Sequence, residues 1–173
     1  MLLVSGPLAS VTSIARVRAF EEAATQHPGI VIAGSCVGEY ARAAARDAVV
    51  QWLAANEAPD GCLAANDVMA LGALEALREA GRKAAVAGVN AIPEAIAAIA
   101  RGEMLATADF NAMQMAALAT ECAVRHLRGE RVPEKIDLPV EIVDRRNCHL
   151  WDLPYEQRPM MTLEEALAQG VLT

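Results

Sequence analysis

The chain of 173 residues carries a formal net charge of −7, with a pI near 5.0, and 54% of its residues are hydrophobic although only 3% are aromatic. Its length predicts one globular domain with a core of its own, and a charged fraction of 21% with a mean hydropathy of +0.24 excludes a disordered chain. The acidic balance and the lack of a dense Lys/Arg cluster argue against nucleic-acid binding, and no apolar run approaches the roughly 18 residues that a membrane span needs.

Short apolar runs alternate along the chain with longer segments of helical period. The runs expected to form strands are Leu2–Ser5, Ile30–Gly34, Gly61–Ala65, Ala84–Val89 and Leu105–Ala108. The segments expected to form helices are Val11–Gln26, Tyr40–Asn56, Asp67–Ala80 and Pro93–Arg101. Uniformly apolar strands that alternate with helices are typical of a parallel sheet covered on both faces, so we predict a doubly wound α/β fold.

The rest of the chain has a different organisation. Ala112–Leu127 has the pattern of a further helix, and Ile136–Arg145 reads as an extended segment. In the tail from Asn147, the sequence Thr162-Leu-Glu-Glu165 predicts a capping box that opens a short helix reaching about Gln169. The predicted fold is therefore a doubly wound sheet with an extra helix, a returning strand and a C-terminal tail.

Cysteine and histidine spacing gives no sign of a metal site. The four cysteines form no CxxC pair and the three histidines form no HExxH pattern, so we expect no metal and no cofactor. Gly34-Ser-Cys-Val-Gly38 matches the nucleophile-elbow pattern between a predicted strand and a predicted helix, which makes a hydrolase dependent on Cys36 one alternative. Since no histidine or acid is placed to activate Cys36, a small-residue turn is the preferred interpretation and no catalytic residue is predicted.

Polar residues follow nearly every predicted strand. They are Ser5, Ser35 to Tyr40, Asn66-Asp67, Asn90 and Asp109 to Asn111. Ligands of open parallel sheets bind outside the carboxyl ends of the strands. Amides and carboxylates hydrogen-bond vicinal hydroxyls with two atoms at once, and aromatic rings cover the apolar face of a sugar. The pattern favours a carbohydrate or polyol binder over a catalyst.

Each of these residues also has an ordinary structural interpretation. Asn66 is a candidate helix N-cap, and Asn90 a turn residue ahead of a proline. Tyr40 could pack on the surface in the first turn of a helix, and Asp109 could cap the helix that begins near Ala112. Taken singly, each structural role is the commoner one, but their joint placement at the strand ends still favours a binding site.

Four segments resemble the type I periplasmic sugar-binding proteins, which are solute-binding components of ABC transporters in the ribose-binding class. The most specific is Ala65-Asn-Asp-Val-Met-Ala-Leu-Gly-Ala-Leu-Glu-Ala-Leu77, and the others are Arg16-Val-Arg-Ala-Phe20, Val86–Pro93 and Gly102–Thr107. The likeness runs in order from about Leu3 to Arg145. LacI-type repressors share this fold and are therefore a second alternative.

The resemblance implies ligand roles for particular residues. It makes Asn66 a ligand of sugar hydroxyls and puts Asn90 where the family usually has an aspartate, so that the hydrogen-bond pattern differs there. Tyr40 lies where an aromatic ring stacks on the sugar.

The remaining candidates depart further from the family pattern. Phe110 falls near the position of a polar hinge ligand, and Asp109 precedes it at the end of the same predicted strand. For the family's ligand arginine, Ile14 and Arg16 both align, and only Arg16 has the required chemistry.

The resemblance also implies a division of the chain. Residues 1–110 match the C-terminal lobe of a two-lobed protein, and residues 111–135 hold a helix that belongs to the N-terminal lobe in the family. Residues 136–146 return towards the hinge, and residues 147–173 form the tail. The first lobe would then be missing, so we expect half of a cleft and weak or no binding by this chain alone.

The helix at 112–127 would lack the sheet that it covers in the family. Its apolar face, which includes Met115, Leu118, Ala119 and Cys122, needs another partner. We expect a homodimer, or a domain swap, through this helix and the tail.

The function implied is that of a carbohydrate or polyol solute-binding component of an ABC importer. It would act in the periplasm with an ABC permease as the partner of the full-length protein. The alternatives are the effector-binding lobe of a LacI-type repressor and the Cys36-dependent hydrolase.

Overall fold

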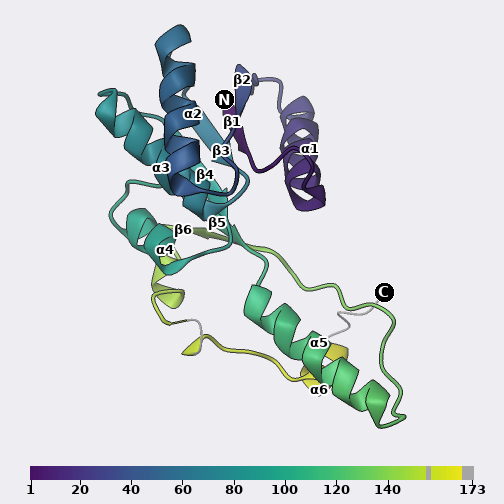
Figure 1. Cartoon of the computed structure of the whole chain (residues 1–173). Coiled ribbons are helices and arrows are strands. Elements are labelled where there is room, and N and C mark those ends of the chain that lie inside the picture. Colours follow the sequence, from purple (N-terminus) through teal and green to yellow (C-terminus); the bar gives the residue numbers. More distant parts are fainter. Residues whose placement is uncertain (155–156, 169–173) are drawn as a thin grey trace.

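A computed structural model describes residues 1–154 and 157–168 and contains one six-stranded sheet in the order β2-β1-β3-β4-β5-β6 (Figure 1). The strands are β1 Leu2–Ser5, β2 Gly34–Val37, β3 Gly61–Ala64, β4 Ala85–Val89, β5 Ala106–Asp109 and β6 Glu141–Asp144. β1 to β5 pair in parallel, while β6 runs antiparallel to β5. The predicted α/β fold with a returning strand is confirmed.

The helices begin and end close to their predicted positions. They are α1 Val11–Gln26, α2 Arg42–Ala55, α3 Asp67–Glu79, α4 Pro93–Ala100, α5 Ala112–Leu127 and α6 Leu163–Ala168, with a short 3-10 turn at Cys148–Leu150. The capping box of α6 is present, since the backbone N of Thr162 donates to Glu165 Oε2 and the backbone N of Glu165 donates to Thr162 Oγ1. Gln169, where we predicted the end of this helix, lies outside the described residues.

The prediction for β2 was wrong by about four residues. The strand is Gly34–Val37, and the apolar run before it is largely exposed, with Ile30 at 41% and Val31 at 71%. β2 is an edge strand and, among the described strands, pairs only with β1, in a register that sets Leu2 beside Gly34. An edge strand is only partly buried, so an apolar run does not mark it as it marks a central strand.

Helices cover the two faces of the sheet unequally. The main core joins β1, β3 and β4 to α2, α3 and α4, and α1 lies on the opposite side of the sheet from α2 and α3 (Figure 1). Leu3 and Leu63 on that side line a small cavity with Phe20 of α1. Farther along the same face, Ile142 of β6 is 61% exposed. This face is therefore less covered at β6 than at β1 and β3 within the described part of the chain.

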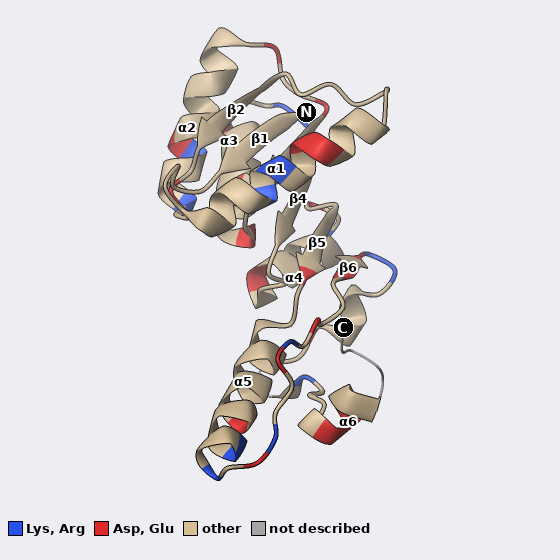
Figure 2. Ribbon diagram, turned by 90° about the vertical axis from the view of Figure 1, so that its right-hand side faces the viewer, with Lys and Arg blue, Asp and Glu red and all other residues tan. Residues whose placement is uncertain are grey.

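α5 follows β5 after two residues, and together with α6 it projects away from the sheet (Figures 1 and 2). They form a second small cluster in which Leu118, Leu163 and Ala166 are buried. The buried Gln114 side chain fixes the tail, because its Nε2 donates to the carbonyl of Met161 at 2.7 Å and its Oε1 accepts from the same residue's N–H at 2.6 Å. The tail thus covers the Leu118 side of α5.

The other side of α5 is apolar and exposed. Met115 is 50% exposed, Val124 40% and Leu127 85%, and Ala119 is exposed as well. Of the face predicted to need a partner, only the part around Leu118 is covered by the residues that the structure describes. Within the described residues, no helix combines the length and the apolar character required to cross a membrane.

Gly72 sets the distance between α2 and α3. A Cβ at this position would lie 2.2 Å from the carbonyl oxygen of Arg42 and 3.0 Å from the backbone N of Arg46. We predict that Gly72→Ala lowers the free energy of unfolding by about 1–3 kcal/mol, because backbone atoms must move to admit the methyl group. Urea unfolding measures this change.

Gly29 provides the matched control, because its added Cβ would meet no atom within 4 Å. Gly29→Ala should change the free energy of unfolding by no more than about 0.5 kcal/mol. Equal stability of the two variants would contradict the close packing of α2 on α3.

Candidate functional site

The carboxyl edge of the sheet gathers the residues that the sequence singled out. Tyr40 follows β2, Asn66 follows β3, Asn90 follows β4, and Asp109 ends β5. Because parallel strands end at one edge, these side chains come from four turns at the same edge of the sheet.

Backbone strain concentrates at this edge. Among the described residues, the non-glycine residues with positive φ are Glu39 (52°), Tyr40 (55°), Asn90 (122°), Ala91 (52°) and Asn111 (50°). All five lie in the turns after β2, β4 and β5. Such conformations persist only where surrounding contacts hold them, and they are enriched at ligand sites.

Asn66 is the N-cap of α3, as one of the two interpretations predicted. Its Oδ1 accepts from the N–H of Met69 at 2.9 Å, and the residue is only 8% exposed. The cap fixes the orientation of the amide. No hydrogen bond from its Nδ2 exists within the described residues, so this group can still donate to a ligand.

A buried carboxylate next to Asn66 organises the neighbouring turn. Asp67 is fully buried, and its Oδ1 accepts from Thr107 Oγ1 at 2.6 Å while its Oδ2 accepts from the N–H of Ile92 at 3.0 Å. Thr107 Oγ1 in turn accepts from the N–H of Ala91 at 3.2 Å. Burial raises the pKa of Asp67, against the opposing effect of the hydrogen bonds that it accepts.

Two buried polar atoms at this edge have no hydrogen-bond partner. They are Asn90 Oδ1 and the hydroxyl oxygen of Tyr40, neither of which has a partner among residues 1–154 and 157–168. The Tyr40 ring packs flat against Gly6, where an added Cβ would lie 2.5 Å from the ring. Tyr40 precedes α2, so the interpretation of it as a first-turn helix residue was wrong. Unpartnered buried polar atoms are rare in native proteins and need an explanation.

Asp109 is engaged in two contacts within the chain. Its Oδ1 accepts from the N–H of Asn111 at 2.8 Å, and its Oδ2 accepts from Trp151 Nε1 at 2.7 Å. The interpretation of Asp109 as the cap of α5 was wrong, because Asn111 is the N-cap and its Oδ1 accepts from the N–H of Gln114 at 3.0 Å.

Arg16 and Phe110 are brought together although they are far apart in sequence. The guanidinium carbon of Arg16 lies 5.4 Å from the centroid of the Phe110 ring, a cation–π contact, and Arg16 Nη1 donates to the carbonyl of Ala65 at 2.6 Å. Ile14, the other residue that aligned with the family's ligand arginine, is 54% exposed.

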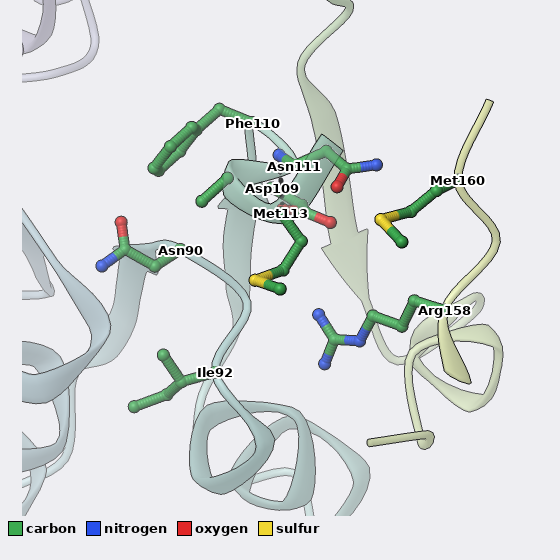
Figure 3. A pocket seen from close by; sticks show the side chains of 9 residues that line it. Asn90, Ile92, Asp109, Phe110, Asn111, Met113, Arg158 and Met160 are labelled. Carbon is green, nitrogen blue, oxygen red and sulfur yellow. Dashed lines mark hydrogen bonds between the residues drawn. The ribbon is translucent and has the colours of Figure 1, made fainter. Parts of the chain in front are cut away.

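A cavity of about 190 Å³ lies beside these turns. Asn90 and Phe110 lie on one side of it, and Arg158 and Met160 of the tail lie on the other (Figure 3). Of the six predicted ligand residues, Asn90, Asp109 and Phe110 line this cavity, whereas Arg16, Tyr40 and Asn66 do not. Sequence reasoning missed Arg158, because no motif or period marks the tail around it.

The environment of Cys36 removes the basis of the hydrolase alternative. Cys36 lies inside β2 and not in a turn between strand and helix. Burial raises the pKa of its thiol to about 11, so the thiolate is scarce at neutral pH. Within the described part of the chain, no group of three or more His, Cys, Asp or Glu side chains is placed to hold a metal ion.

Comparison with known proteins identifies the family. The sequence model of the family called periplasmic binding protein domain matches residues 1–131. The chain belongs to this family. Among curated members, the ribose import binding protein RbsB of Escherichia coli (strain K12) is 33% identical over 135 residues, which is 76% of this chain and 45% of RbsB. The transcriptional repressor MelR of Bacillus subtilis (strain 168) is 29% identical over 77% of this chain and 38% of its own length.

Solved structures of periplasmic binding proteins share the fold. A solute-binding protein from Actinobacillus succinogenes with bound D-allose has a TM-score of 0.82 and 27% identity, over 86% of this chain and 53% of that one. The myo-inositol-binding protein of Caulobacter has a TM-score of 0.78 and 30% identity, over 86% of this chain and 52% of that one. The predicted resemblance to sugar-binding proteins of ABC transporters is confirmed, and the chain spans about half the length of these relatives or less.

Thr107 offers a test of the buried network. We predict that Thr107→Val lowers the free energy of unfolding of this periplasmic-binding-protein domain by about 1–3 kcal/mol, because it leaves Asp67 Oδ1 and the N–H of Ala91 buried with one partner fewer. Chemical denaturation measures the loss.

Thr120 is the matched control, since it is exposed on α5 and its hydroxyl donates only to the carbonyl of Ala116. Thr120→Val should stay within about 0.5 kcal/mol of the parent protein. A loss at Thr120 as large as that at Thr107 would argue against a special role for the network.

Proposed function

We propose that this chain is the sugar- or polyol-binding lobe of a solute-binding protein that serves an ABC importer. The observation that carries the proposal is the pair of buried, unpartnered polar atoms, Asn90 Oδ1 and the Tyr40 hydroxyl, at the edge of the sheet where ligands of this fold class bind. Ligand hydroxyl groups would supply the missing hydrogen bonds. The names of the related proteins, which include binders of ribose, D-allose and myo-inositol, support this class of ligand.

The proposed contacts follow from the geometry of each side chain. Asn90 Oδ1 accepts from a ligand hydroxyl, and Asn66 donates through Nδ2 while its Oδ1 caps α3. Tyr40 offers its ring and its hydroxyl. Phe110 presents an apolar ring to the ligand, and the guanidinium of Arg16 packs on this ring.

Asp109 has a different part in this site. Both of its oxygens already accept hydrogen bonds from Asn111 and Trp151. A carboxylate oxygen has two lone pairs, so a ligand hydroxyl could be added to this arrangement without breaking it.

We further propose that residues 1–110 act as one lobe and that another lobe completes the cleft. The small size of the cavity at the carboxyl edge supports an open half-site. Residues 111–135 would then contact the second lobe, residues 136–146 would return to the hinge, and residues 147–173 would form the tail. The whole protein would act in the periplasm with an ABC permease.

A repressor lobe is the second candidate function, because MelR is among the relatives. The two candidates share the sugar site and differ in what accompanies it. A helix-turn-helix encoded with this domain would favour the repressor, and a signal sequence with a first lobe would favour the importer.

Ligand titration followed by NMR tests the proposed function on this chain. D-ribose, D-allose and myo-inositol should shift the amide signals of Asn66 and Asn90 with a dissociation constant of about 1 mM or weaker, since half a cleft encloses the ligand poorly. Asn90→Ala should abolish the ligand-induced shift at position 90 and weaken, without removing, the shift at Asn66. Asn56→Ala is the control, because Asn56 is exposed and donates only to the carbonyl of Trp52.

Two outcomes would count against the proposal. If no signal at the carboxyl edge responds to any of the three ligands, the site is wrongly placed. If the isolated chain binds one of them with micromolar or higher affinity, the proposal that this chain forms only half of the cleft is wrong.

The exposed side of α5 supports a homodimer as the state of this chain in solution, either side by side or with exchanged tails. Met115 and Leu127 are 50% and 85% exposed there, and covering them removes apolar surface from water.

We expect a dimer by sedimentation at tens of micromolar concentration, a range typical of modest interfaces. Met115→Lys should shift it to monomer, whereas Leu8→Lys, at an exposed position in the turn between β1 and α1, should not. A monomeric parent protein would contradict this prediction.

A further inference from the structure

The tail crosses the ends of two neighbouring strands and bonds to both. Trp151 Nε1 donates to Asp109 at the end of β5 at 2.7 Å. Arg158 Nη1 donates to the carbonyl of Ala91 after β4 at 3.0 Å, and its Nη2 donates to the carbonyl of Trp151 at 3.2 Å. Trp151 and Arg158, which are bonded to each other, thereby form a bridge from the β5 end to the β4 end, at the sheet edge that carries the proposed ligand residues.

The bridge ends on one of the strained turns of the site. Asn90 and Ala91 both have positive φ, at 122° and 52°. The N–H of Ala91 is held by Thr107 Oγ1, and its carbonyl is held by Arg158. Contacts on both sides of a strained residue are what keeps such a conformation populated.

An arginine is suited to this position because it can bond several carbonyls at once. Besides the carbonyls of Ala91 and Trp151, the Arg158 Nε donates to the carbonyl of Leu153 at 3.3 Å. A lysine ammonium lacks the flat, forked arrangement of donors that spans these separate acceptors. The same guanidinium faces the cavity from the side opposite Asn90 (Figure 3).

We infer that Arg158 is a positioning residue for ligand binding: it fixes the Asn90–Ala91 turn from the tail, so that the unpartnered Asn90 Oδ1 is presented to the ligand. The inference rests on the proposed function for the ligand itself. The tail is then a part of the binding site and not an appendage to the domain. Ligand specificity at Asn90 then depends on Arg158, which lies 68 positions later in the sequence.

The first arm of the test needs no ligand. Arg158→Lys should raise the hydrogen-exchange rate of the Ala91 amide by about ten- to a hundredfold, the factor that corresponds to losing a hydrogen bond to a charged donor. Arg146→Lys is the matched control, because the Arg146 side chain is 89% exposed and pairs with Asp144. Exchange at Ala91 that is unchanged by Arg158→Lys and by Arg158→Ala would overturn the inference.

The second arm separates positioning from a loss of folded structure. With D-allose as the probe, Arg158→Lys should reduce the ligand-induced shift at Asn90 by about tenfold or more, while the shift at Asn66 is retained, because Asn66 is held by its own cap in α3. An equal loss at both residues, or none at either, would overturn the positioning role. If the parent protein responds to no ligand at all, the proposed function fails, and the first arm still decides whether Arg158 holds the turn.

Discussion

The burial of one carboxylate is the constraint on which the site depends. Asp67 is inaccessible to solvent, and it accepts hydrogen bonds from Thr107 of β5 and from the N–H of Ile92 at the start of α4. A buried charge is tolerated only where such donors converge on it. Gly88 of β4 makes the approach possible, because an added Cβ would lie 2.3 Å from Asp67 Oδ1. One side chain therefore ties the N-terminus of α3 to β4, β5 and α4.

This tie explains how a strained turn can persist at the strand ends. With Ile92 bonded to Asp67 and Ala91 bonded to Thr107, the chain leaving β4 has few conformations open to it, and Asn90 is forced to positive φ. The same strained residue, Asn90, carries the unpartnered Oδ1. A turn that is fixed before the ligand arrives loses little conformational entropy on binding, which favours affinity.

Sequence reasoning succeeded where one segment carries the whole signal. The central strands, the helix periods, the N-cap at Asn66 and the capping box of α6 all follow from local pattern. It failed for β2, because an edge strand is only partly buried and leaves no strong apolar run. It also missed the pairing of Asp67 with Thr107 and the contact of Arg158 with Ala91, since these join residues 40 and 67 positions apart. No single sequence encodes such a pairing in its spacing.

The two regions that depart from a doubly wound sheet differ in what they bury. α5 and α6 share a small apolar cluster around Leu118 that is separate from the main core, and they project away from the sheet. The segment around Trp151 instead packs on the main core and bonds to Asp109. A contact on the exposed side of α5 would leave the sheet edge intact, because Trp151 and Arg158 bond directly to that edge, at Asp109 and Ala91. The exposed side of α5 is thus available for partners, whereas Trp151 and Arg158 maintain the geometry of the proposed site.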